Sequence, residues 1–148
     1  MVDYAAFKLV GKSMEPILTI GDVILVKKVT PHDLTVADMI VFEHNNQVIV
    51  HRFVGTDDKG GLLTKPEVTI VQTDPYPITH DRLIGKVIAA YRGTKEISIG
   101  RSSIMARLYY RSLLALNRSP VYLKMKSAGY FRLPYLLITR LRRLFKNK

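Results

Sequence analysis

Residues 11–16 read Gly-Lys-Ser-Met-Glu-Pro, and residues 20–26 read Ile-Gly-Asp-Val-Ile-Leu-Val. The second stretch is an apolar strand pattern that follows a Gly-Asp bend, so Ser13 is expected between a strand and a proline-broken turn. A hydroxyl held on a rigid sheet in this way has the placement that a nucleophile needs. The simpler interpretation is that Ser13 caps one helical turn by accepting a backbone N–H bond. The rest of the chain has to decide between the two.

Short apolar stretches separated by turn residues recur through the first hundred residues. Residues 38–43 and 47–55 are expected to pair as a hairpin, because the Asn45-Asn46 turn between them tolerates left-handed backbone geometry. The full set of predicted strands is 4–10, 22–28, 38–43, 47–55, 62–65, 68–73 and 82–92, of which 62–65 and 68–73 are either two strands or one bulged strand. Many short strands at hairpin spacing predict a mainly β protein, built as a folded sheet or barrel of antiparallel strands.

The composition changes after residue 100. Residues 1–100 contain 11 Lys and Arg against 12 Asp and Glu, whereas residues 101–148 contain 12 basic residues and no acidic ones. Leucine recurs at helical spacing over 101–117 and 132–147, which predicts two basic amphipathic helices. We therefore expect a β domain over 1–100 followed by a basic helical tail over 101–148.

The overall composition excludes several classes of protein. Hydrophobic residues make up 47% of the 148 residues, which supports a domain with a packed core rather than a disordered chain. There is no cysteine, so a disulfide, a thiolate metal site and a cysteine nucleophile are all excluded. No window reaches the roughly 18 apolar residues of a membrane span, and the first residues lack a signal-peptide pattern. We expect no cofactor and no bound metal.

A serine nucleophile needs a base, and His51 lies in the predicted strand 47–55. A histidine in a buried strand is more often structural, so His51 alone carries little weight. The chain also holds, in order, Asp-Met-Ile-Val-Phe (38–42), Val-His-Arg (50–52), Asp-Pro-Tyr-Pro-Ile (74–78) and Ile-Gly-Lys-Val (84–87). Together with the serine stretch, this ordered set resembles the type I signal peptidase family, which shares its catalytic fold with the self-cleaving SOS-type repressors. The resemblance covers about residues 5–92.

The resemblance implies roles for individual residues. Ser13 matches the nucleophile. His51 matches a position that holds lysine in most bacterial members and histidine in the archaeal, endoplasmic-reticulum and sporulation-type branch. Asp74 matches the acid before a Pro-rich turn in that Ser-His branch. Residues 64–67, Thr-Lys-Pro-Glu, stand where the family usually has Thr-Lys-Gly-Asp, so Glu67 is the second candidate for the third catalytic residue. Asp81 is a further acid, best explained as a solvated turn residue.

The activity implied by the resemblance is that of a serine endopeptidase that cleaves leader or signal peptides after small residues. Neutral His51 would take the Ser13 proton, and backbone N–H groups at the serine turn would bind the oxyanion. Met14 and Val10 are expected to help form a shallow substrate cleft. One alternative is a self-cleaving regulator on the same fold, although no DNA-binding domain precedes Ser13 and the segment before it is short for a substrate. Another is a non-catalytic module whose basic tail binds membrane or RNA.

The tail 101–148 is the feature that departs most from this family. Family members usually carry an N-terminal membrane anchor, whereas this chain begins almost at the serine strand. We expect the tail to bind an anionic membrane surface, with Lys and Arg at the headgroups and Leu, Phe and Tyr at the apolar boundary. Nucleic acid is the competing acidic partner, and a solvated helical cap on the barrel is the simplest alternative. We favour the membrane because the apolar faces are large, which predicts peripheral membrane association, with the cytoplasm as second choice.

Overall fold

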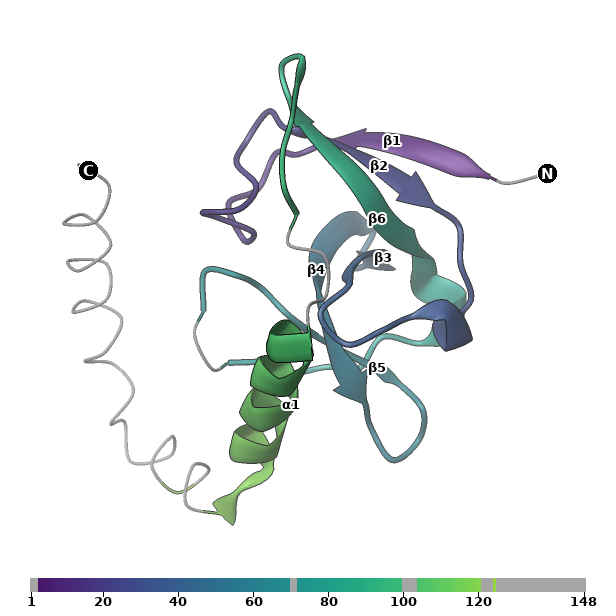
Figure 1. Ribbon diagram of the computed structural model, residues 1–148. Helices are drawn as coiled ribbons and strands as arrows, with labels where there is room; N and C mark the ends of the chain where they lie inside the picture. The colour runs from purple at the N-terminus through teal and green to yellow at the C-terminus, as the bar shows by residue number, and fades with distance from the viewer. Residues whose placement is uncertain (1–2, 70–71, 100–103, 121–123, 125–148) are drawn as a thin grey trace, which may run out of the picture. The chain divides into compact units, whose positions relative to one another are not determined.

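The computed structural model describes residues 3–69, 72–99, 104–120 and 124 (Figure 1). Its elements in chain order are β1 (Tyr4–Lys8), β2 (Val23–Lys27), the 3-10 turn η1 (Pro31–Asp33), β3 (Met39–His44), β4 (Gln47–Thr56), β5 (Leu62–Lys65), the 3-10 turn η2 (His80–Arg82), β6 (Leu83–Arg92), β7 (Lys95–Glu96) and α1 (Ile104–Arg118). The chain divides into two compact units, residues 1–114 and 115–148. The predicted helix over 101–117 is present as α1, and the one over 132–147 lies outside the described residues.

The strands of the described residues form one antiparallel sheet. Their order is β1-β2-β6-β3-β4-β5, with β7 beside β6 (Figure 1). The β3–β4 hairpin has the predicted turn, in which Asn45 and Asn46 take φ angles of 50° and 60°. Asparagine tolerates this left-handed conformation, which matches the right-handed twist of the paired strands. The mainly β fold predicted from strand spacing is confirmed.

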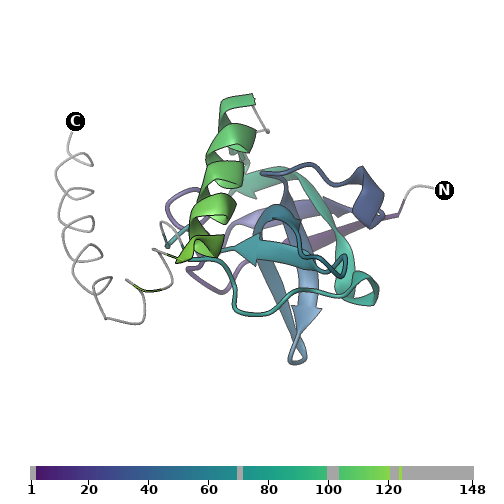
Figure 2. The same ribbon diagram turned by 90° about the horizontal axis from the view of Figure 1, so that it is seen from below.

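The sheet is bent at three places where its register shifts. The shifts lie between β2 and β6, between β3 and β6, and between β4 and β5. An extra residue on one strand bends that strand and increases its twist, so the shifts let the sheet curl, as Figure 2 shows. Because of this curl, both faces of the sheet can bury apolar side chains.

Strand β3 is buried on both faces. Successive side chains of a strand point to opposite sides, and the four residues Met39–Phe42 are all buried. Met39 and Val41 pack in one apolar cluster, which also contains Met14 and Val50. The residues between and after them, Ile40 and Phe42, pack in a second cluster. The second cluster is completed by Phe53, Leu62 and Ile78. Two cores therefore share β3 as their common wall.

The start of α1 contributes to a third apolar cluster in the first compact unit. Tyr110 and Leu113 are buried there against Val54 of β4 and against Ala37. Gly55 of β4 has a φ of 146°, and a Cβ atom at this position would lie 3.0 Å from a methyl carbon of Leu114. A glycine therefore permits the close approach of α1 to β4. Within the described ranges, no helix combines the length and apolar character needed to span a bilayer.

The prediction of a strand over 68–73 is wrong for the described residues of that range, which form turns and irregular backbone. In this segment the buried ammonium group of Lys65 donates to the carbonyls of Pro66 and Thr69 at 2.9 and 2.5 Å. A buried charge must gather acceptors, and here it takes carbonyls that a sheet ladder would otherwise use. The chain therefore folds back on itself after β5.

Candidate active site

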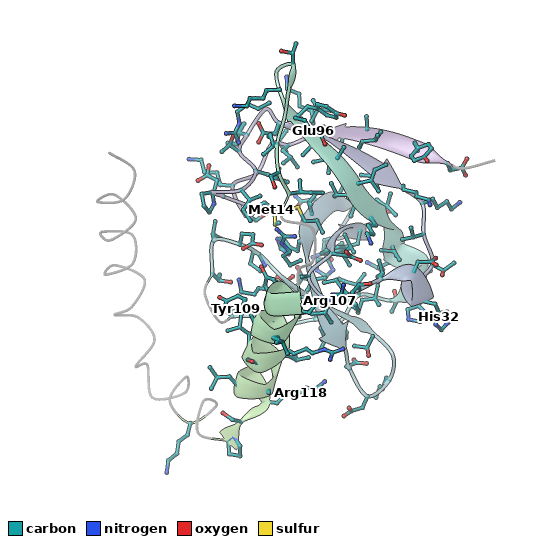
Figure 3. All side chains as sticks on the ribbon, in the orientation of Figure 1. Met14, His32, Glu96, Arg107, Tyr109 and Arg118 are labelled. Carbon is teal, nitrogen blue, oxygen red and sulfur yellow. The ribbon has the colours of Figure 1, made fainter. Side chains whose placement is uncertain are left out.

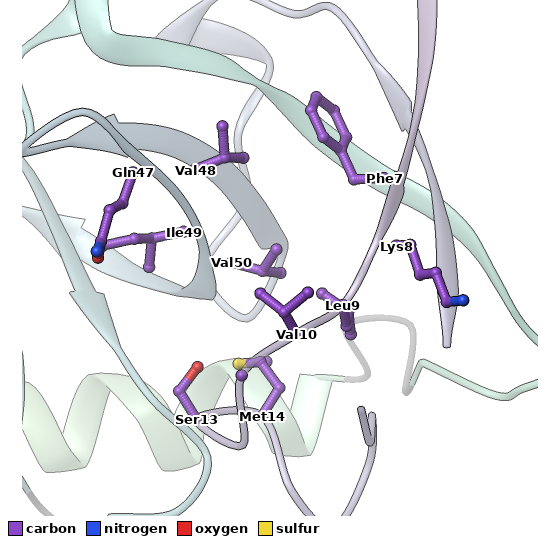
Figure 4. A pocket seen from close by; sticks show the side chains of 11 residues that line it. Phe7, Lys8, Leu9, Val10, Ser13, Met14, Gln47, Val48, Ile49 and Val50 are labelled. Atoms are coloured by element: carbon purple, nitrogen blue, oxygen red, sulfur yellow. The ribbon is translucent and has the colours of Figure 1, made fainter. Parts of the chain in front are cut away.

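Ser13 lies in the turns that connect β1 and β2. Two backbone bonds close these turns, from the Glu15 N–H to the Lys12 carbonyl and from the Leu18 N–H to the Met14 carbonyl, each 3.0 Å long. The Ser13 side chain is half-buried and lines a pocket of about 470 Å³. Figure 4 shows Ser13 at one end of this pocket and Phe7 of β1 toward the other.

The pocket is bounded by the end of β1 and the start of β4, and its lining is mainly apolar. It is lined by Phe7, Lys8, Leu9, Val10, Gly11, Ser13, Met14, Gln47, Val48, Ile49 and Val50. Met14 and Val10, the two residues predicted to form the cleft, both line this pocket but differ in their exposure. Met14 is only 2% exposed and packs into the core (Figure 3), whereas Val10 is 85% exposed. Val10 therefore offers most of its side chain to a ligand, and Met14 supports the floor.

The turn after Ser13 is anchored by Asp22, whose carboxylate is buried. It accepts hydrogen bonds from the Thr19 N–H at 2.8 Å and from the Arg92 guanidinium at 2.9 and 2.8 Å. These hydrogen bonds hold the pKa of Asp22 below its ordinary value of 3.8, and those from Arg92 contribute most. Burial of the carboxyl opposes this effect. The Gly-Asp bend seen in the sequence is thus a fixed link between β2 and the end of β6.

His51 lies in β4 with its ring almost completely buried. Its Nδ1 atom is 2.7 Å from Oδ2 of Asp74, and its ring meets the edge of Phe42 at a centroid distance of 5.9 Å. An ionised carboxylate can only accept, so Nδ1 carries a proton, and in the neutral ring Nε2 then holds a lone pair. Nε2 has no hydrogen-bond partner among the described residues, where no fully buried side-chain nitrogen or oxygen lacks one. Nε2 is therefore reachable from solvent.

Asp74 is itself held in place by Thr64 of β5. The buried Thr64 hydroxyl donates to the same Oδ2 atom at 2.5 Å, and the Asp74 N–H donates to the Thr64 carbonyl at 2.8 Å. Two residues further along the loop, Tyr76 stacks on His44 at a centroid distance of 3.7 Å. Burial and the nearby Asp74 charge raise the pKa of Tyr76. The carboxylate that orients His51 is thus fixed through both its backbone and its side chain.

Glu67, the second candidate acid, has different partners. Its Oε1 atom accepts from Arg52 Nε at 2.6 Å and from the Tyr110 hydroxyl at 2.9 Å. Arg52 also donates to the carbonyls of Ala37 and Ile99, each at 2.8 Å. Glu67 therefore belongs to a buried network that is separate from the His51–Asp74 pair. The third acid, Asp81, lies exposed in η2, where a bond from the Thr79 side chain lowers its pKa.

The structure also shows how the serine turn is connected to these acids. The N–H of Val68, the residue after Glu67, donates to the Ser13 carbonyl at 3.1 Å. In the described part of the chain, the Ser13 hydroxyl makes no hydrogen bond to His51. Such bonds are often long before substrate binds and shorten in the reactive complex.

Three residues of these hydrogen-bond networks, Thr64, Arg52 and Tyr110, were not singled out from the sequence. Thr64 and Arg52 stand inside quoted motifs, directly beside Lys65 and His51, and their motif positions were the available signal. Tyr110 reaches Glu67 from 43 residues away, and nothing in its local sequence indicates that contact.

The curled antiparallel sheet carries Ser13 in the turns after β1 and, on β4, His51 bound to the Asp74 carboxylate. The chain belongs to the peptidase S24-like family, because that family's model matches residues 2–88, more than half of the chain. The resemblance seen in the ordered motifs is thus confirmed at the level of the family and its fold. A comparison with curated proteins gave no match. The matched range contains Ser13, His51, Glu67 and Asp74, and it supports a peptidase or a self-cleaving member of the family.

Proposed function

We propose that this protein is a serine endopeptidase that cleaves leader or signal peptides after small residues. Ser13 is the nucleophile, His51 the general base and Asp74 the residue that orients the imidazole. The observation that carries this proposal is the 2.7 Å contact between His51 Nδ1 and Asp74 Oδ2. In the neutral ring, that contact places the proton on Nδ1 and leaves the lone pair on Nε2, which is the tautomer that a general base requires.

The chemistry follows from this protonation state. Nε2 of His51 takes the hydroxyl proton as the Ser13 oxygen attacks the peptide carbonyl, and Asp74 stabilises the imidazolium that forms. Backbone N–H groups of the serine turn bind the oxyanion. The imidazolium then gives its proton to the leaving amine, which leaves an ester on Ser13. Water, deprotonated by the same His51, hydrolyses the ester and restores the enzyme.

The pocket supports an extended peptide as the substrate. β1 is the first strand in the sheet order, so one of its edges carries no other strand within the described part of the chain. An extended peptide can add to such an edge through main-chain hydrogen bonds, while its side chains enter the neighbouring pocket. The preference for small residues before the cut rests on the family resemblance. The mainly apolar lining favours uncharged side chains at these positions.

The test is incubation of the full chain with leader peptides that carry small residues before candidate cleavage sites, followed by mass spectrometry. Ser13→Ala should abolish cleavage and leave the fold intact, because a lost turn hydroxyl costs at most about 1 kcal/mol. Cleavage by the alanine variant would remove Ser13 from the mechanism. If fragments of the chain itself appeared instead, and only with Ser13 present, the self-cleaving alternative would replace the endopeptidase.

We also propose that residues 101–148 bind an anionic membrane surface. The described part of this segment supports the proposal, since α1 carries exposed Leu108 and Leu116 together with exposed Arg107, Arg111 and Arg118. Figure 3 shows Arg107 and Arg118 near the two ends of this helix. Basic side chains are attracted to anionic headgroups, and the leucines add apolar burial at the interface. RNA binding is the competing outcome.

A further inference from the structure

The loop that follows β5 is hydrogen-bonded to the main chain of Ser13. Val68 donates its N–H to the Ser13 carbonyl at 3.1 Å. On either side of Val68, the buried Lys65 ammonium binds the carbonyls of Pro66 and Thr69. We call residues 66–69 the support loop. One hydrogen bond therefore joins the support loop to the backbone of the proposed nucleophile.

A buried carboxylate also ties the support loop to β4 and α1. Glu67 precedes Val68, and its Oε1 atom accepts from both Arg52 and Tyr110, at 2.6 and 2.9 Å. Arg52 comes directly after His51 in β4, so its bond to Glu67 joins this strand to the support loop. The side chains of Arg52 and Glu67 are only 5% and 12% exposed, which keeps water from competing for the pair.

Tyr110 adds α1 to this network. It is buried with Leu113 against Val54, and Gly55 gives Leu114 room to approach β4 closely. Burial and the Glu67 charge raise the pKa of Tyr110, so its hydroxyl stays protonated and donates across the neutral range. Without Tyr110, Arg52 would still have its bonds to Glu67, Ala37 and Ile99. The Tyr110 hydroxyl is therefore the link that is specific to α1.

We propose that α1 is a positioning element for the active site, in which Tyr110 holds Glu67 and thereby fixes the bond from Val68 to Ser13. The catalytic consequence rests on the proposed peptidase function, whereas the mechanical link from α1 to Ser13 does not. Tyr110 and Glu67 are positioning residues, since they act through the support loop and not on the substrate. The family match ends at residue 88, so α1 lies outside the matched region.

The test compares Tyr110→Phe with Tyr109→Phe in the full chain. Both changes remove one hydroxyl from adjacent residues, but Tyr109 is half-exposed and its ring packs edge-on against Tyr110. Amide hydrogen exchange at Val68 reports the bond to Ser13 directly. Loss of one buried hydrogen bond should speed this exchange by about five- to tenfold in Tyr110→Phe. Tyr109→Phe should exchange like the unchanged protein, and β3 and β4 should keep their protection in both variants.

Peptide cleavage by the same two variants supplies the second measurement. Tyr110→Phe should lower kcat about five- to tenfold without changing KM, because the pocket is untouched while Ser13 is less well placed. The pH profile should keep its shape, because the His51–Asp74 pair does not change. Unchanged Val68 exchange, faster exchange spread over β3 and β4, or faster exchange with an unchanged kcat would each overturn the inference. If the unchanged protein cleaved no peptide, the proposed function would fail, and Val68 exchange would still decide whether α1 holds Ser13.

Discussion

Nδ1 of His51 lies 2.7 Å from Oδ2 of Asp74, in a chain where a second acid, Glu67, is bound instead by Arg52 and Tyr110. The two carboxylates therefore have separate tasks. Asp74 fixes one imidazole tautomer, and Glu67 neutralises a buried guanidinium. Substitution of each acid by its amide should separate these tasks experimentally.

Asp74→Asn should lower kcat for peptide cleavage on the order of 10²- to 10⁴-fold, with little change in the fold. An asparagine amide can donate to Nδ1, which would leave the proton on Nε2 and remove the lone pair that accepts the serine proton. Steady-state kinetics on a leader peptide measure the effect, and circular dichroism checks the fold. A variant that kept more than half of its activity would show that Asp74 does not orient the base.

Glu67→Gln should act mainly on stability. The substitution leaves the Arg52 guanidinium without its carboxylate in a buried site, which should cost about 1 to 3 kcal/mol in the free energy of unfolding. Urea unfolding followed by circular dichroism measures this cost. The loss of kcat should be smaller than in Asp74→Asn. The reverse order of activity losses would mean that Glu67, and not Asp74, completes the catalytic site.

Asp22→Asn should change how stability depends on pH. Because the pKa of Asp22 in the folded protein is lower than its ordinary value of 3.8, the ionised carboxylate stabilises the fold above that value. This stabilisation is lost as the pH falls through the lowered pKa. The variant should therefore be less stable than the unchanged protein at pH 7, and the difference should shrink in strong acid.

Urea unfolding at pH 7 and at several acidic values tests this expectation for Asp22. The matched control is Asp58→Asn, because Asp58 is an exposed residue in the turn between β4 and β5. That control should follow the unchanged protein at every pH. A stability difference for Asp22→Asn that stayed constant into strong acid would mean that the charge of Asp22 is not what stabilises the bend.

The full chain should sediment with anionic vesicles and be partly released by high salt, because each basic residue near such a surface contributes about 1 kcal/mol that salt screens. Neutral vesicles should bind it poorly. A chain ending at Ser119 should lose most of the binding. It is a better comparison than a chain ending at residue 100, which would lack the buried side chains of Tyr110 and Leu113.

RNA binding by the full chain is measured alongside vesicle binding, because RNA is the competing partner. Indifference to anionic vesicles, together with RNA binding that weakens steeply with salt, would make residues 101–148 a nucleic-acid surface. Binding to neither would leave them as a solvated helical cap.

Features set by neighbouring residues could be predicted from the sequence. The turn at Asn45 and Asn46 depends only on their own backbone preferences, and the strands around it followed from local patterns. Ser13, His51 and Asp74 were found because they stand in ordered motifs. The sequence placed Asp74 ahead of Glu67 by its match to the acid of the Ser-His branch, and Asp74 is the acid that contacts His51.

Features set by distant contacts could not be predicted. Residues 68–71 read Val-Thr-Ile-Val, a good strand sequence, but the Lys65 ammonium binds the carbonyls of Pro66 and Thr69 and turns the chain. The partners of Glu67 were missed for a similar reason, since Tyr110 reaches it only because α1 docks on β4. Burial of a charge and docking of a helix are properties of the whole fold.

The burial of β3 on both faces has a consequence for how this protein unfolds. Met39 and Val41 face the core that contains Met14, next to the serine, while Phe42 faces the core on which the His51 ring rests. Damage to either core must displace the same strand and so disturbs the other. We expect heat or denaturant to melt the serine side and the histidine side in one cooperative step. A partly melted molecule with only the serine side or only the histidine side folded would then not accumulate.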